Sequence, residues 1–257
     1  MRYLITGLSA LALATIASPA LAQDETDPPK PVTVSGSVAV VSDYKFRGIS
    51  QTDGNFAVQG GITVSHESGF YASVWGSSVD SYVTAHGTAH QEIDLIAGFK
   101  TTASGVTFDI GALYYVYPGT RLPGDVSASD FVEPYASLSY AIGPVTAKAS
   151  VAYAPKQKAL ALNQIGPKND NVYIAADFSA TIPETPIGVS AHVGHTFGPS
   201  WLSIGKEYTD WSVGANYTWN SLTFGVSYVD ADGGPFITPS GKDAAKGAVL
   251  GSVSVAF

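Results

Sequence analysis

The chain ends in a strand-like alternation of residues that finishes on an aromatic side chain. Val249, Val253 and Phe257 fall on one face of an extended strand, whereas Ser252 and Ser254 fall on the other. Membrane-spanning barrel strands need this pattern, because one face of each strand meets lipid and the other meets the barrel interior. The end of the chain therefore predicts the fold, the solvent and the cellular compartment together.

Twelve stretches of the chain alternate with period 2, and Gly, Pro, Asn, Asp and Ser separate them. Most have the length of about 9–11 residues that a tilted strand needs to cross a membrane. The predicted strands are 32–41, 56–65, 70–76, 92–100, 106–117, 131–140, 145–154, 171–180, 188–197, 208–219, 222–230 and 247–257. We therefore expect an all-β fold, a transmembrane antiparallel β-barrel of about twelve strands in an up-and-down meander.

The connections between these strands alternate regularly between short and long. Short connections are expected at 66–69, 101–105, 141–144, 181–187 and 220–221. Long connections are expected at 42–55, 77–91, 118–130, 155–170, 198–207 and 231–246. A membrane barrel predicts this order, because its turns are tight on the periplasmic side and its loops are longer outside. A soluble secreted sandwich predicts no such order.

The beginning of the chain has the features of an export signal. Arg2 gives a positive start, residues 4–17 are mostly apolar, and residues 20–22 form an A-x-A cleavage site. We expect three segments, which are a signal peptide at 1–22, a periplasmic lead-in at 23–31 and the barrel at 32–257. Together with the barrel pattern, this predicts a location in the cell outer membrane.

Composition agrees with a lipid-facing barrel and excludes several classes of site. Charged residues make up 13% of the chain, about half the usual share. The formal net charge is −8 and no basic cluster is present, so no nucleic-acid binding is expected. The chain has no cysteine, which excludes disulfides, a thiol nucleophile and a thiolate metal site.

The polar faces of the predicted strands carry the charges. A charge facing lipid costs about 2–4 kcal/mol at the membrane midplane, so the polar faces are expected to point inward. The inward charges are six acids and two lysines, namely Glu92, Asp94, Asp109, Glu133, Asp177, Asp210, Lys100 and Lys148. An open lumen of this kind favours cations or neutral solutes. The alternative is that these groups pair with each other and fill a closed core. Strand 70–76 is ambiguous, because Tyr71 and Trp75 oppose Phe70 and Val74.

The stretch 43–52 mixes charged, aromatic and amide side chains where the first predicted strand ends. One interpretation is that Lys45 and Arg47 line the barrel mouth or a constriction folded into the lumen. The other is that they form an interfacial anchor, in a loop that plugs the barrel for stability. The sequence leaves both interpretations open.

The same stretch also carries a family resemblance. The sequence VSDYKFRGISQT at 41–52 is followed by SHESGFYASVWGS at 65–77, and acidic motifs begin two later strands at 92–94 and 131–135. This pattern resembles the TorF-type porin family over essentially the whole mature chain. The resemblance implies a proteobacterial outer-membrane protein acting as a porin, and it carries over no substrate and no site residues.

Two motifs have the residue types of metal sites. His86 and His90, with Glu92 nearby, have a spacing that could hold a metal on a helix, but they lie in a loop, where we expect solvated histidines. The acidic stretch 230–234 lacks the distal glutamate of a calcium loop, so we expect an acidic turn. No metal site and no cofactor is therefore predicted.

Histidines and lysines elsewhere give two weaker signals. On strand 188–197, His192 is expected to face inward and His195 outward, and the chain has no G-x-S-x-G motif, so no catalytic residue is predicted. Lys156, Lys158 and Lys168 make one long loop basic. That loop either contacts anionic lipopolysaccharide or is simply solvated.

The chain as a whole predicts an outer-membrane channel that passes small hydrophilic solutes by diffusion and selects them by lumen width and by an acidic wall. The candidate lumen and constriction residues are Lys45, Arg47, Glu92, Asp94, Asp109, Glu133, Lys148, Asp177 and Asp210. Two other hypotheses are a non-conducting barrel that acts through its long outer loops and an outer-membrane hydrolase. The expected partners are outer-membrane lipid, lipopolysaccharide and small solutes, and neither the solute nor the oligomeric state is predicted.

Overall fold

The computed structural model describes residues 31–85, 89–120, 129–162, 164 and 166–257. The predicted signal peptide and all but the last residue of the predicted lead-in lie outside these ranges. Within them, no helix is long and apolar enough to cross a membrane.

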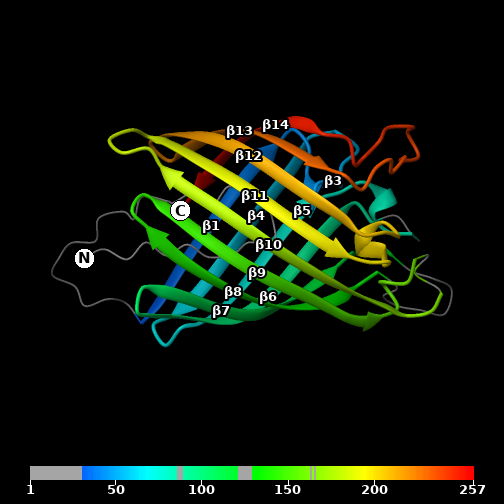
Figure 1. Ribbon diagram of the computed structural model, residues 1–257, viewed down its shortest axis with the longest axis horizontal. Coiled ribbons are helices and arrows are strands. Elements are labelled where there is room, and N and C mark those ends of the chain that lie inside the picture. Colours follow the sequence, from blue (N-terminus) through cyan, green and yellow to red (C-terminus); the bar gives the residue numbers. More distant parts are fainter. Residues whose placement is uncertain (1–30, 86–88, 121–128, 163, 165) are drawn as a thin grey trace.

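Twelve antiparallel strands form a closed barrel in which each strand pairs with its neighbours in the chain, and the first pairs with the last. Figure 1 shows the strands running at a tilt around one axis. The barrel strands are β1 (Val32–Val41), β4 (Ala57–His66), β5 (Phe70–Ser78), β6 (Gln91–Ala103), β7 (Val106–Val116), β8 (Phe131–Ile142), β9 (Val145–Gln157), β10 (Asn169–Thr181), β11 (Ile187–Phe197), β12 (Tyr208–Trp219), β13 (Leu222–Ala231) and β14 (Ala248–Ala256). This order confirms the predicted twelve-strand meander.

Several strands are longer than their apolar pattern predicts. β6, β9 and β10 have 13 residues each. The pairing of β6 with β7 continues to Ala103 and Val106 at the short turn. Strand pairing depends on backbone groups, so it can continue where the side chains no longer match a lipid environment.

The two ends of the barrel differ in the length of their connections. The short turns lie at the end where β1 begins and β14 ends, and the long connections lie at the other end (Figure 1). The long connections contain four small elements, which are β2 (Lys45–Phe46), β3 (Ile49–Ser50) and the 3-10 turns η1 (Ser81–Val83) and η2 (Trp201–Ser203). By the usual orientation of such barrels, we call the short-turn end periplasmic and the long-loop end outer.

The outer surface of the wall is apolar, as the alternation predicts. Val213 and Val226 are 49% and 53% exposed on neighbouring strands. The ambiguous strand is now assigned, since Phe70 and Val74 of β5 are 63% and 51% exposed whereas its tyrosine and tryptophan are buried. The inward charges predicted from the sequence do face the interior, which keeps the lipid-facing wall free of them.

The seam between the first and last strands is short. β1 pairs with β4 over ten residues but with β14 only from Ser37 to Val41. At its periplasmic end, Gly36 and Phe257 exchange two backbone hydrogen bonds of 2.8 and 2.9 Å. A Cβ at Gly36 would lie 2.7 Å from the Phe257 ring, so a glycine is needed where the terminal aromatic crosses the seam.

We predict that Val226→Arg destabilises the protein folded in lipid vesicles, lowering its free energy of unfolding by about 2–4 kcal/mol. The reason is that this side chain meets lipid near the middle of β13. The matched control is Ser227→Arg on the inward face, which should lose less than half as much. Urea titration of folded protein in vesicles measures both values, and equal losses would contradict the assignment of the two faces.

Candidate functional site in the barrel lumen

A small hairpin, formed by β2 and β3, folds into the lumen directly after β1. Lys45 pairs with Ser50 and Phe46 pairs with Ile49, which leaves Arg47 and Gly48 as a two-residue turn. Both turn residues have positive φ, 48° and 78°, as a type I′ hairpin turn requires. The long loop predicted at 42–55 therefore contains an ordered β-hairpin of residues 45–50, which we call the lumen hairpin.

The tip of the lumen hairpin reaches the wall formed by β12 and β13. A Cβ at Gly48 would lie 2.7 Å from Cβ of Ala231 and 2.9 Å from Cβ of Asp210. Only a glycine combines that close approach with a left-handed backbone. The hairpin thus extends from the end of β1 to a wall strand late in the chain.

Arg47 joins the lumen hairpin to two further strands. Its Nη2 donates to both carboxylate oxygens of Glu133 on β8, at 2.7 and 2.9 Å, and its Nη1 donates to Asn171 Oδ1 on β10 at 3.2 Å. The guanidinium also lies 4.1 Å from the ring centre of Tyr173. Burial alone would lower the pKa of Arg47, but the adjacent Glu133 carboxylate outweighs it and raises the pKa. The arginine is therefore a fixed positive charge.

Lys45 joins the lumen hairpin to the last loop of the barrel. Its Nζ lies 3.1 Å from the carbonyl oxygens of Gly48 and Ala244 and 2.9 Å from that of Lys246. Burial lowers the pKa of Lys45, and nearby carboxylates, including Asp43, partly oppose this shift. Three carbonyl acceptors match the three donors of an ammonium group.

A second set of contacts continues this link on the outer side. Ser50 N donates to Ala244 O at 2.9 Å, Thr238 Oγ1 to Asp53 Oδ1 at 2.7 Å, and Lys242 Nζ to Asp53 O at 2.7 Å. Together with the bonds of Lys45, these contacts tie the first loop to the last loop across the β1–β14 seam. We call them the loop latch.

Glu92 and Asp94 lie in the wall among aromatic side chains. Tyr44 and Tyr117 donate to the two oxygens of Glu92, at 2.8 and 2.6 Å. Asp94 is fully buried, and no described residue donates a hydrogen bond to either of its oxygens. The inward side chains of β5 to β8 are bulky here, and we call this the aromatic half of the lumen, with Tyr71, Ile96, Leu113, Tyr115, Tyr117 and Phe131.

Asp109 and Lys100 face each other on neighbouring strands. Lys100 Nζ lies 3.6 Å from Asp109 Oδ2, and Tyr71 donates to Asp109 Oδ1 at 2.7 Å. Tyr71 is also hydrogen-bonded to Tyr135. The acid is thus held by a lysine and a tyrosine in the aromatic half.

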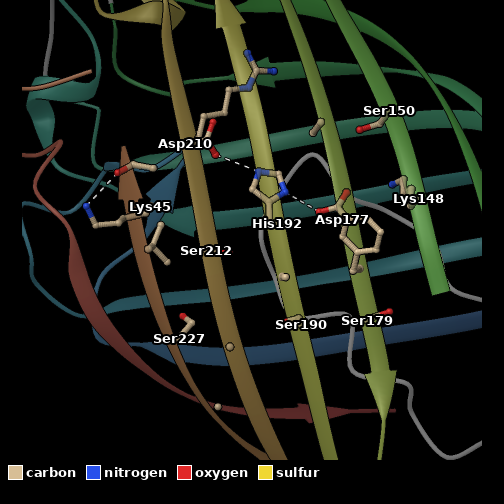
Figure 2. Close-up of a pocket in the computed structure, with 18 of the residues that line it drawn as sticks. Lys45, Lys148, Ser150, Asp177, Ser179, Ser190, His192, Asp210, Ser212 and Ser227 are labelled. Atoms are coloured by element: carbon tan, nitrogen blue, oxygen red, sulfur yellow. Dashed lines mark hydrogen bonds and ion pairs between the residues drawn. The ribbon is translucent and has the colours of Figure 1, made fainter. Parts of the chain in front are cut away.

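His192 lies between two carboxylates on the opposite side of the lumen (Figure 2). Its Nδ1 is 2.7 Å from Asp177 Oδ1, and its Nε2 is 3.1 Å from Asp210 Oδ1. Tyr173 Oη approaches the same Nε2 at 2.9 Å. Both ring nitrogens can donate to the two acids only when the ring is an imidazolium, and neither is then free to take a proton from a nucleophile.

A cavity of about 230 Å³ occupies the lumen on the periplasmic side of the hairpin. Seven of the nine candidate residues line it, namely Lys45, Arg47, Asp109, Glu133, Lys148, Asp177 and Asp210. Glu92 and Asp94 are not among its lining residues. Its acids also include Asp43, and its basic groups also include Lys100 and His192. The cavity is therefore less acidic than the inward strand faces alone, because two acids are enclosed in the aromatic half and the segment after β1 adds two cations and one acid.

Small hydroxyl side chains form much of the remaining cavity wall. Figure 2 shows serines on β9 to β13 around His192 and along the same strands. We call this the hydroxyl half of the lumen, with Ser150, Ser179, Ser190, Ser212, Ser227 and Ser252. Short side chains leave the space that the cavity occupies, whereas the aromatic half is filled.

The sequence did not single out several residues that complete the site. Asn171 and Tyr173 bind Arg47, and Tyr44 binds Glu92. Asn171 and Tyr173 could have been found from the alternation along β10, because their spacing of two places both side chains on its inward face. The hairpin partners cannot be read from local pattern, because Arg47 and Glu133 are 86 positions apart.

The other sequence signals lie away from this site. Among the described residues, no group of three His, Asp or Glu side chains could hold a metal ion. His90 is exposed, and His86 lies outside the described residues. His195 contacts Thr209, not the lumen groups around His192.

Comparison with known proteins places this barrel in a family. A family model described as a bacterial protein of unknown function (Gcw_chp) matches residues 25–257. The chain belongs to this family. No curated protein matches the chain. The finer resemblance to TorF-type porins stays a prediction.

Solved structures give the same fold. The chain is similar to the NanC porin, with a TM-score of 0.56 and 12% identity over 88% of this chain and 99% of that chain. It is also similar to the KdgM porin, with a TM-score of 0.54 and 8% identity over 88% of this chain and 98% of that chain. These likenesses confirm the barrel fold.

We predict that Glu133→Gln destabilises the docked lumen hairpin by about 3–5 kcal/mol, because it leaves the buried Arg47 charge without its carboxylate. Trypsin added to protein in vesicles should then cleave after Arg47 faster than in the unchanged protein. Glu67→Gln, in an exposed turn, is the control and should not alter cleavage. Unchanged resistance in Glu133→Gln would show that the ion pair does not hold the hairpin.

Proposed function

We propose that this protein is an outer-membrane channel that passes small hydrophilic solutes by passive diffusion. The observation that carries the proposal is the cavity within a closed barrel, lined by fixed charges and by the hydroxyl half of the lumen. A lipid-facing wall with a polar interior is the general plan of diffusion channels. The porin folds found by comparison support the same function and the same location.

The path for solutes runs along the hydroxyl half. In the aromatic half, the cluster that includes Tyr71 and Phe131 is packed and leaves little space. In contrast, β9 to β14 line the cavity with serines and glycines. Hydroxyl groups replace hydrogen bonds that a hydrated solute loses on entry. The lumen hairpin forms the outer boundary of this path and sets its narrowest part.

The selectivity that we propose is for neutral polar solutes. Five carboxylates line the cavity, and four lysine or arginine side chains with His192 face them. Several of these groups form pairs with each other. Paired charges give a weak net field, so the reversal potential under a salt gradient should be small.

The outer surface supports one partner beyond the solute. Lys156 at the end of β9 and Lys168 just before β10 are exposed, on either side of the loop that joins these strands. Exposed cations at the outer end of a barrel attract anionic groups, so we propose that this loop contacts lipopolysaccharide. The protein acts without catalysis in this proposal, because His192 is held between two acids.

We predict that the refolded protein gives small conductance steps in planar bilayers and admits small neutral sugars in liposome swelling. Ser212→Trp, on the inward face of β12, should lower the conductance by roughly half or more, because an indole side chain narrows the path. Val213→Trp, on the lipid-facing side of the same strand, should leave it unchanged.

The hairpin provides a second arm of this test. Replacing residues 43–55 with a short Gly-Ser linker should raise the conductance, since it removes the boundary between the cavity and the outer loops. Silence of the unchanged, correctly folded protein, with conduction only after this replacement, would overturn the proposal and favour a plugged barrel that acts through its loops.

A further inference from the structure

A second cavity, of about 350 Å³, lies on the outer side of the lumen hairpin. It shares no described lining residue with the inner cavity, so the hairpin separates the two. Phe46 and Ile49 of the hairpin line the outer cavity, whereas Lys45 and Arg47 line the inner one. The two sides of the hairpin therefore face chemically different spaces.

Aromatic side chains from separate segments converge on the outer cavity. They come from the hairpin, η1, the end of β7, η2, β12 and the last loop, and are Phe46, Tyr82, Tyr117, Trp201, Tyr208 and Phe236. Leu162, Leu202 and Ile204 add aliphatic surface. None of the described lining residues is charged.

The polar ends of these side chains are largely engaged within the protein. Tyr82 Oη donates to Ser50 O at 2.5 Å, Tyr117 Oη to Glu92 Oε2 at 2.6 Å, and Trp201 Nε1 to Val83 O at 3.0 Å. Gln164, a polar lining residue, donates to Ala159 O at 3.2 Å and accepts from Ser129 Oγ at 2.9 Å. Tyr208 Oη is buried and has no hydrogen-bond partner among the described residues. Apart from this hydroxyl, the cavity is left with ring surfaces and aliphatic groups to offer a ligand.

Size and chemistry together define the ligand. Ligand sites usually have volumes of about 300–1,000 Å³ and are lined mainly by apolar and aromatic side chains. An apolar cavity of about 150 Å³ holds benzene, so a cavity roughly twice that size has room for two fused rings. A charged group would lose its hydration here without gaining a partner.

We propose that the outer cavity is a binding site for an uncharged small molecule built on one or two aromatic rings. This site goes beyond the proposed diffusion of hydrophilic solutes, since it lies on the other side of the hairpin and has the opposite polarity. Ring stacking against the converging aromatic side chains supplies the attraction. The bound molecule contacts the lumen hairpin through Phe46 and Ile49.

The test uses full-length protein in nanodiscs, because free detergent would compete for an apolar site. The probe is 2-naphthol, followed by equilibrium dialysis, with 2-naphthalenesulfonate as the charged analogue and glucose as a sugar. We expect saturable binding of 2-naphthol at one site per chain, at least about tenfold weaker binding of the sulfonate, and no competition by glucose.

Variants locate the site. Leu202→Trp fills the outer cavity and should weaken 2-naphthol binding about tenfold or more, and Ile204→Trp is a second variant with the same expectation. Leu250→Trp adds the same bulk to the inner cavity and should change binding less than about twofold. Folding of each variant is checked by its heat-modifiable migration on gels.

The outcomes separate this site from the channel. Absence of saturable binding, competition by glucose, or an effect of Leu250→Trp without one of Leu202→Trp and Ile204→Trp would overturn the proposal. Because binding is measured without current, a silent channel would leave this result intact, and a conducting channel would not by itself support it.

Discussion

Every backbone amide in the lipid-facing wall must find its partner within the wall, because the hydrocarbon layer offers no hydrogen bonds. Twelve antiparallel strands meet this demand by closing on themselves, so that every strand has a paired neighbour on both sides. Closure at this strand number leaves more interior space than an eight-stranded barrel, whose side chains just fill it. The contents of the lumen follow from that surplus space.

The protein fills the surplus unevenly. Large rings on β5 to β8 pack into a continuous cluster, and Phe46 of the lumen hairpin rests against it. Small hydroxyl groups on the opposite strands leave a polar cavity. The hairpin stands between, with its charged turn held by Glu133 and Asn171. One short segment therefore separates the lumen into a polar and an apolar compartment.

Strand number, strand order and the direction of nearly every side chain could be predicted from the sequence, because one alternating pattern determines them all. Phe99 and Lys100 illustrate this, because consecutive strand residues point to opposite faces, which assigns Phe99 to lipid and Lys100 to the lumen. Strand 70–76 could not be assigned, because aromatic residues on both faces satisfy either direction. The partner β6, where Glu92 and Asp94 must point inward, settles it in the structure.

The candidate site was less predictable, since its character depends on contacts between distant strands. Asp94 has the sequence context of a lumen charge, yet it is enclosed by the aromatic half. The sequence left open whether Lys45 and Arg47 line the lumen or anchor the loop at the interface, and the lumen hairpin places them in the lumen, where they offset the acids. Local pattern indicates which face a residue occupies, and the tertiary arrangement decides whether solvent reaches it.

The loop latch links the lumen hairpin to the way the chain comes together. β1 is the first strand of the barrel and β14 the last, and their short pairing closes the ring. The hairpin follows β1 directly, while its tethers, Ala244 and Lys246, directly precede β14. The same two ends of the chain therefore close the wall of the barrel and hold the hairpin that divides its interior.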